Sequence, residues 1–163
     1  MRKCAAFICI LAAIGLLSAH PHFRKTVTMK IGENELKLTY TTTPANIEHL
    51  NNIQPETYNA GYGTLTLTSD LAVDGKILKA GDYTIGAIMN GSDDWTMALY
   101  EGKPQRGAEP DMSKVVKLDS MFSKSEGTAH HVYFDIMPGH GKFEGNTVLI
   151  WHFGPLFLAG RIQ

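Results

Sequence analysis

Cysteine is almost absent from this sequence of 163 residues, which contains only Cys4 and Cys9. Both lie in a segment that we expect to be removed on export, so the mature chain would hold neither a disulfide nor a thiol. This absence excludes thiolate metal sites and cysteine catalysis. An exported domain without disulfides relies on its hydrophobic core, and it fits a bacterial periplasm or cell exterior better than a small eukaryotic secreted scaffold.

Long apolar runs are also missing, except for one at the N-terminus. A basic pair, Arg2 and Lys3, precedes an apolar stretch that continues to Leu17. This order is typical of a cleaved signal peptide, and the stretch is too short and wrongly flanked for a spanning helix. We therefore predict a signal peptide over residues 1–19 and a single domain over residues 20–163. The mature protein would be secreted or periplasmic, with no membrane span.

The chain has no dense run of basic residues. Without the basic pair of the signal peptide, 13 of the 15 Lys and Arg side chains remain against 16 acidic ones, a formal net charge of −3. Nucleic-acid binding proteins usually show a basic patch or stripe. Nucleic acid is therefore not an expected partner.

Alternation of apolar and polar residues dominates the rest of the chain. Segments 26–31 and 36–41 each alternate with a period of two on either side of a glycine-containing turn, which predicts a hairpin. Asp74-Gly75 is a strong tight-turn pair between two further apolar runs. About eight strands with little helix predict an all-β fold, an antiparallel β-sandwich.

Three segments depart from simple alternation. Residues 44–63 have no clean period, and we expect a short helix over 45–50 in an otherwise long surface loop, a kind of loop that is often functional. Residues 102–113 are polar and contain proline, which predicts a second loop. Residues 147–158 are apolar on both faces and predict one central strand that bends at Gly154-Pro155.

One motif between residues 65 and 100 resembles a known family. It has the pattern L-x-A-G-x-Y followed by a turn and a tryptophan, and Pro21-His22 stands near the expected first strand. The motif residues are Leu78, Ala80, Gly81, Tyr83 and Trp95. In these features the chain resembles the bacterial secreted family catalogued as domain of unknown function 2911. The resemblance implies a β-sandwich of unknown activity.

The physical interpretation of this motif is structural. Gly81 supplies backbone freedom, and Tyr83 and Trp95 are large anchors for a sheet interface. Nothing in the motif transfers protons. Members of the family usually carry a polar segment with arginine and glutamate before the central strands, whereas Tyr58–Thr64 has neither. A polar site at that position is therefore not expected here.

Histidine is the main candidate for metal chemistry. Cleavage at the predicted site would make His20 the N-terminal residue, whose amine and ring can chelate copper. Pro21 excludes the competing copper mode, which needs an amide N–H at the second position. His22, His131 and His152 are candidates to complete the site, because imidazole suits copper or zinc. The alternative interpretation places His20 and His22 on a frayed terminus.

The other polar clusters favour structural roles. Adjacent strand residues point to opposite faces, so His130 and His131 are not expected to bind one ion together. Asp93-Asp94 is predicted to be part of a turn. The chain has no nucleophile elbow and no glycine-rich phosphate loop.

Two function classes stay open. The first is an exported, non-enzymatic β-sandwich that acts as a binding or envelope-associated module, with an unknown ligand or envelope component as its partner and no cofactor. The alternative is a copper-binding or copper-redox protein that uses His20. No pattern in the sequence supports hydrolase activity.

Overall fold

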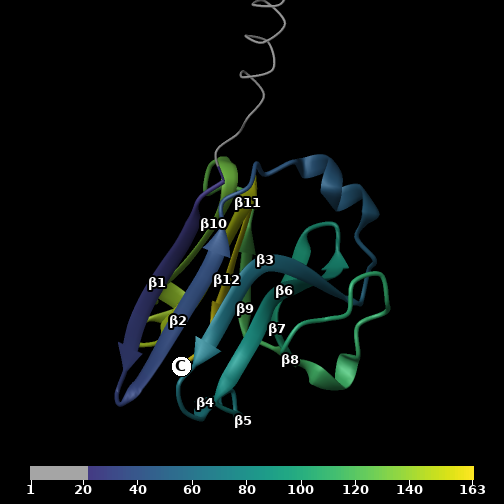
Figure 1. Cartoon of the computed structure of the whole chain (residues 1–163). Coiled ribbons are helices and arrows are strands. Elements are labelled where there is room, and N and C mark those ends of the chain that lie inside the picture. The colour runs from purple at the N-terminus through teal and green to yellow at the C-terminus, as the bar shows by residue number, and fades with distance from the viewer. Residues whose placement is uncertain (1–21) are drawn as a thin grey trace, which may run out of the picture.

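The computed structural model describes residues 22–163. The predicted signal peptide, and with it His20 and Pro21, lies outside the described residues. The strands form two antiparallel sheets and a small separate hairpin (Figure 1), which confirms the prediction of an all-β fold. In the part of the chain that is described, no helix has the length and apolar character needed to cross a membrane.

The larger sheet has six strands in the order β1-β2-β3-β6-β7-β8. These strands are β1 (Arg24–Ile31), β2 (Asn34–Thr41), β3 (Tyr58–Leu67), β6 (Gly81–Gly91), β7 (Asp94–Glu101) and β8 (Val115–Lys117). The predicted first hairpin is confirmed, since β1 and β2 pair in antiparallel register. The apolar positions Leu36 and Leu38 of β2 are fully buried, as the period of two requires.

The separate hairpin consists of β4 (Leu71–Val73) and β5 (Lys76–Leu78). Its turn residues, Asp74 and Gly75, have positive φ angles of 48° and 76°. Positive φ at both central residues is the requirement of the type I′ turn, for which Asp-Gly is a preferred pair. The tight turn predicted at this pair is therefore confirmed.

The smaller sheet has four strands in the order β10-β11-β12-β9. They are β9 (Ser120–Ser123), β10 (Ala129–Pro138), β11 (Thr147–Gly154) and β12 (Leu156–Arg161). The prediction of one bent strand over 147–158 is wrong. The chain reverses at Gly154-Pro155, and Phe153 pairs with Leu156 across a two-residue turn. Gly154, with φ of 56°, supplies the left-handed conformation that this reversal needs.

The segment 44–63 also differs in part from its prediction. A 3-10 helix, η1 (Ile47–Asn52), takes the place of the short helix expected over 45–50. The rest is not all loop, because Tyr58–Gly63 forms the first half of β3. The structure has twelve strands in its described part, more than the eight or so expected, since four of them are only three or four residues long.

The core lies between the two sheets. Phe134 of β10 is fully buried and packs edge-on to Tyr40, with ring centroids 5.4 Å apart. On the other side it stacks on Trp151, at 5.3 Å. Ring pairs at these separations add about 0.5–1.5 kcal/mol each beyond the burial of their area. Phe134 therefore ties β2 of the larger sheet to β10 and β11 of the smaller one.

The residues of the L-x-A-G-x-Y motif, and the tryptophan that follows it, help to build the fold. Leu78, Tyr83 and Trp95 all belong to the main core cluster. The Tyr83 hydroxyl donates to the Lys79 carbonyl at 2.9 Å. Gly81 has a φ of 149°, which a residue with a side chain rarely adopts. These positions agree with the structural interpretation of the motif.

Ala80, the remaining residue of the motif, is held by a hydrogen bond of its backbone N–H. The N–H of Ala80 donates to a carboxylate oxygen of Asp70 at 3.0 Å. The other oxygen of that carboxylate forms an ion pair with Lys79 at 2.8 Å. Asp70 therefore fixes the segment between the β4–β5 hairpin and β6.

Candidate functional site

The first half of β3 is a free strand edge. On one side β3 pairs with β6 from Tyr58 onward, but on the other side it pairs with β2 only from Gly63 onward. Residues 58–62 therefore have no strand partner on the β2 side. A register shift between Ala60 and Thr64 marks a bulge in the same place, and bulges bend a strand locally.

Glycine is needed at this bulge because the backbone of β3 passes close to the smaller sheet. A Cβ on Gly61 would lie 2.8 Å from the carbonyl oxygen of Ile85 and 3.1 Å from the ring of Trp151. Both distances are shorter than ordinary van der Waals contact, and the nearer one is to backbone, which cannot shift without disturbing β6. The bend of β3 therefore depends on residue 61 having no side chain.

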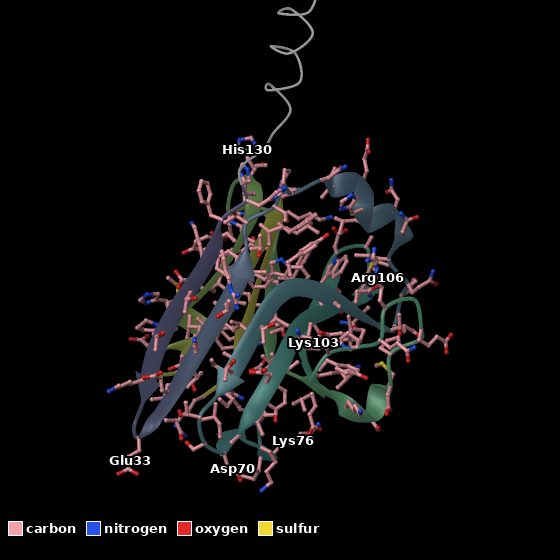
Figure 2. The ribbon with its side chains drawn as sticks, viewed as in Figure 1. Glu33, Asp70, Lys76, Lys103, Arg106 and His130 are labelled. Atoms are coloured by element: carbon pink, nitrogen blue, oxygen red, sulfur yellow. The ribbon has the colours of Figure 1, made fainter. Side chains whose placement is uncertain are left out.

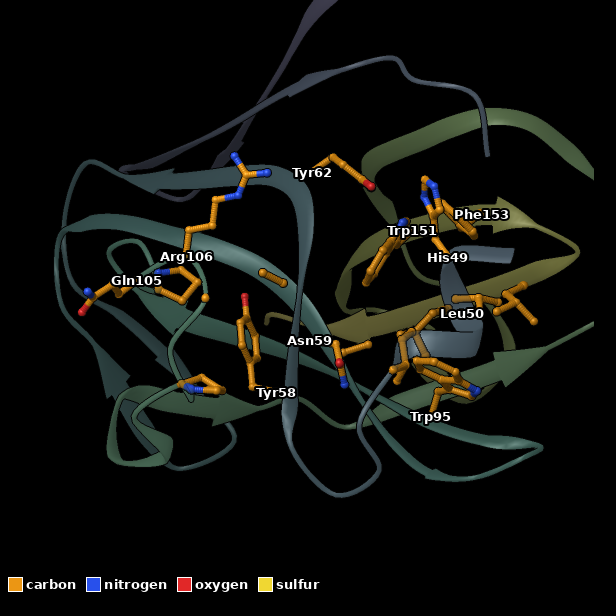
Figure 3. A pocket seen from close by; sticks show the side chains of 18 of the residues that line it. His49, Leu50, Tyr58, Asn59, Tyr62, Trp95, Gln105, Arg106, Trp151 and Phe153 are labelled. Atoms are coloured by element: carbon orange, nitrogen blue, oxygen red, sulfur yellow. The ribbon is translucent and has the colours of Figure 1, made fainter. Parts of the chain in front are cut away.

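A hollow of about 460 Å³, called the edge hollow below, surrounds this free edge. Its lining comes from both faces of the larger sheet and from the inner face of the smaller one. The aromatic residues of the lining are Tyr58, Tyr62, Trp95, Phe122, Trp151 and Phe153. In Figure 3, β3 passes between Tyr58, Gln105 and Arg106 on one side and His49, Trp151 and Phe153 on the other.

Two connecting segments cover the edge hollow. The helix η1 contributes His49 and Leu50, and the side chain of its N-cap residue, Asn46, accepts the N–H of Glu48 at 3.0 Å. The loop 103–111 contributes Arg106 and its neighbours. The first segment falls in the stretch 44–63, which was predicted to hold a short helix in a loop of an often functional kind, and the second falls in the loop predicted over 102–113.

The loop 103–111 is tied down at each end. At its start, the carbonyl of Gly102 accepts the hydroxyl of Thr84 at 2.6 Å. At its end, the carboxylate of Asp111 accepts the N–H of Ser113 at 3.0 Å and caps a short 3-10 helix, η2 (Met112–Lys114). The first contact ties the start of the loop to β6, and the second fixes the turn from the loop into η2.

The inner part of the edge hollow is walled by both tryptophans of the chain. Trp95 begins the core-facing side of β7 and stacks on Phe122, with ring centroids 6.4 Å apart. Trp151 comes from β11 and stacks on Phe134. The indole N–H of Trp151 is buried and has no hydrogen-bond partner among the described residues. Such orphaned donors are rare in folded proteins.

The outer part of the edge hollow has Tyr58 as its floor. The ring of Tyr58 packs against that of Tyr100, with centroids 5.4 Å apart, and its hydroxyl donates to the Thr84 carbonyl at 2.7 Å. Burial, and then the nearby Tyr100, raise the pKa of the Tyr58 phenol. The hydroxyl is therefore a satisfied donor and stays protonated at neutral pH.

The lining of the edge hollow contains basic side chains and no carboxylate. Arg106 and His49 line the edge hollow, and no aspartate or glutamate does. Arg106 takes part in no ion pair among the described residues. Among the described residues that line the edge hollow, the Arg106 guanidinium is therefore the one permanent charge.

The candidate metal ligands are held in other places. The Nδ1 atom of His22 lies 3.0 Å from the Thr42 carbonyl. The backbone of His131 forms an isolated antiparallel β-bridge with Pro44. Both histidines therefore contact the segment 42–44. The Nε2 atom of His152 lies 3.3 Å from the Gly127 carbonyl. Residues 22–163 contain no group of three or more His, Cys, Asp or Glu side chains placed to hold a metal ion. The copper hypothesis depends on His20 and stays a prediction.

The remaining histidine that the sequence singled out also lies away from the edge hollow. Figure 2 shows His130 at the end of the sandwich opposite Glu33 and Asp70, where its backbone carbonyl accepts the N–H of Ala45 at 3.0 Å. It is exposed, although Val132 on the same strand is buried. A register shift between Ala129 and Tyr133 accounts for the difference.

Asp93, Asp94 and Asp135 have structural positions. Asp93 lies in the turn before β7, as predicted, and its ion pair with Lys124 lowers the pKa of its carboxyl group. Asp94 is the first residue of β7 itself. On β10, Asp135 accepts the hydroxyl of Tyr133, which raises the pKa of that phenol to about 12.

The edge hollow was not found from the sequence, and neither were the roles of Arg106, His49 and Trp151. The only signal was the loop composition of its two covers. Comparison with protein-family models, with curated proteins and with solved structures found no match for this chain.

Proposed function

We propose that this protein is an exported, non-enzymatic β-sandwich that binds a small, largely apolar molecule in the edge hollow. One observation carries the proposal: a hollow of about 460 Å³ with a mostly aromatic and aliphatic lining. Small-molecule sites are typically about 300–1,000 Å³, apolar, and fitted with few polar groups. Export, and kinship with the family catalogued as domain of unknown function 2911, are parts of the proposal that rest on the sequence.

The chemistry of the lining supports binding more than catalysis. Acyl or phosphoryl transfer needs a nucleophile with an adjacent base, or a pair of tuned acids and bases. The lining holds no serine, threonine, cysteine or carboxylate. The hydroxyl of Tyr58 is already engaged by the Thr84 carbonyl. His49 is left without a partner group for proton transfer.

The binding site is tested with a neutral fluorescent probe, N-phenylnaphthylamine, excited directly. We expect saturable binding with one probe per chain. Ala108 lines the edge hollow from the exposed loop, so Ala108→Trp should fill its mouth and weaken binding by about tenfold or more. The matched control is Ala72→Trp, an equally large change at an exposed position of β4 outside the lining.

Two results would contradict the proposed function. One is the absence of saturable binding for this probe. The other is equal affinity in the two tryptophan variants, which would place the probe elsewhere on the protein.

Export is tested separately by N-terminal sequencing of protein recovered outside the cytoplasm. A first residue at His20 is expected. A chain that starts at another residue would exclude the amine chelate on which the copper hypothesis depends.

A further inference from the structure

The charge of the edge hollow selects among ligands. Its two basic residues, Arg106 and His49, face no acidic residue in the lining, and Arg106 has no ion-pair partner among residues 22–163. A guanidinium binds a carboxylate with geometrically matched, charge-assisted hydrogen bonds. Arg106 would repel a cationic head at the same place, and this repulsion opposes the attraction that the aromatic rings of the lining exert on cations.

The uncharged polar groups of the lining offer both a donor and an acceptor. The Trp151 indole N–H is a buried donor without an acceptor among the described residues. Asn59 uses its amide nitrogen on the Gln54 carbonyl at 3.1 Å and the Thr57 carbonyl at 3.0 Å. Tyr58 uses its hydroxyl on Thr84. The Trp151 N–H is therefore an unused donor, whereas the amide oxygen of Asn59 can still accept, so the choice of an anionic ligand rests on Arg106.

Burial decides how such a ligand is oriented. Trp95 and Phe153 are almost fully buried, whereas Arg106 is exposed at the rim. Moving a charge into an apolar interior is costly unless it is paired. The apolar part of the ligand therefore belongs against the tryptophans, and its charge belongs at the rim.

We infer that the occupant of the edge hollow is an amphipathic anion, an apolar body with one carboxylate or similar acid group, whose head is held at Arg106. This inference rests on the proposed function and names the ligand class of the same site. Aliphatic and aromatic acids share this chemistry.

The test compares three ligands with the same ten-carbon chain and different heads: decanoate, decanol and decyltrimethylammonium. Each displaces N-phenylnaphthylamine from the full mature protein. At low salt we expect decanoate to bind about two- to fivefold more tightly than decanol, the range of an exposed ion pair. The cation should bind most weakly. The preference for decanoate should shrink between about 0.01 M and about 0.15 M salt, because the Debye length falls.

A charge-neutral variant locates the head group. Arg106→Gln should remove the preference for decanoate and leave the affinity for decanol unchanged. The matched control is Lys103→Gln, which removes a positive charge from the same loop outside the lining of the edge hollow. Lys103→Gln should keep the preference.

The outcomes separate the two proposals. If the neutral probe and decanol both fail to bind, the proposed function is wrong. If they bind but decanol or the cation binds as tightly as decanoate, the edge hollow remains a binding site and the inference of an anion is overturned. If Arg106→Gln behaves as Lys103→Gln does, the placement of the head at Arg106 is overturned.

Discussion

The ring of Tyr58 lies directly against Gly86. A Cβ on Gly86 would come within 2.5 Å of two carbons of that ring, and it would also meet the backbone oxygen of Asn59. Because residue 86 has no side chain, the ring covers the backbone of β6 and its hydroxyl reaches the Thr84 carbonyl at 2.7 Å. This contact sets the floor of the edge hollow and holds the free edge of β3 against β6.

Gly86→Ala should therefore destabilise the protein. Overpacking a filled core typically costs about 1–3 kcal/mol, and we expect the upper end because the added methyl group meets backbone as well as a ring. The measurement is the free energy of unfolding in urea. Gly91→Ala is the control, since a Cβ there has no neighbour within 4 Å. Equal losses in the two variants would show that the contact with Tyr58 is unimportant.

Tyr58→Phe tests the hydroxyl on that floor. Removing it leaves the Thr84 carbonyl with one partner fewer, and we expect a loss of about 1 kcal/mol at neutral pH. The pKa of Tyr58 is raised in the folded state, so the native protein keeps a proton that the unfolded chain loses above about pH 10. Stability should fall as the pH rises through that value, by about 1.4 kcal/mol per pH unit for this group.

The variant should consequently lose less stability than the wild type when the pH is raised. Between about pH 8 and about pH 11, the wild type should lose about 1.4 kcal/mol relative to the variant, so that its advantage of about 1 kcal/mol disappears and is slightly reversed. Unfolding in urea at both pH values measures it. Tyr62→Phe, at a tyrosine that is 48% exposed, is the control for the loss of a hydroxyl. A constant difference across this range would contradict the burial of the Tyr58 phenol.

The sequence predicted the elements whose signals are local. Alternation identified β1 and β2, and Asp74-Gly75 identified the turn of the second hairpin. The first half of β3 was missed because two glycines and a bulge interrupt its pattern. Its strand geometry comes from pairing with β6, as in the pair of Tyr58 with Ile88, and this partner is distant in the sequence.

The edge hollow could not be predicted for a related reason. It exists because β2 pairs with β3 only from Gly63 onward, and because β7 and β11 bring Trp95 and Trp151 to the same space. Neither fact has a local signature. His22, His131 and His152 were candidates by residue type, and their placement in space had no local signal in the sequence.

Asp74→Ala should loosen the connection between the two-stranded hairpin and the smaller sheet. The Asp74 carboxylate accepts the N–H of Asp119 at 3.1 Å and forms an ion pair with Arg161. Its positive φ also disfavours alanine. We expect a loss of about 2–3 kcal/mol in urea unfolding, most of it from the hydrogen bond and the backbone conformation, since exposed ion pairs contribute at most about 1 kcal/mol.

Asp74→Asn is the matched control for this prediction. Asparagine tolerates the left-handed conformation and retains an oxygen for the Asp119 N–H, so only the charge is lost. The expected loss is below about 1 kcal/mol. If the asparagine variant is as unstable as the alanine variant, the ion pair with Arg161 contributes more to stability than the hydrogen bond and the backbone conformation do.

The two tryptophans provide an internal reporter of the edge hollow, because they are the only ones in the chain and both line it. Trp95→Phe and Trp151→Phe each leave a single emitter. In both variants, decanoate at saturation should shift the emission to shorter wavelength and reduce quenching by acrylamide, since the apolar chain displaces water from the remaining indole. Acetate, which has the same head and no apolar body, should change neither signal.

The variants Trp95→Phe and Trp151→Phe should also differ in their free energies of unfolding. Replacing Trp151 also removes its orphaned N–H, whose burial costs about 1–3 kcal/mol, and this gain offsets the loss of ring area. We therefore expect the free energy of unfolding of Trp151→Phe to lie within about 1 kcal/mol of the wild-type value. That of Trp95→Phe should be lower than the wild-type value by about 1–2 kcal/mol. A greater loss in Trp151→Phe than in Trp95→Phe would show that the indole N–H is satisfied in solution.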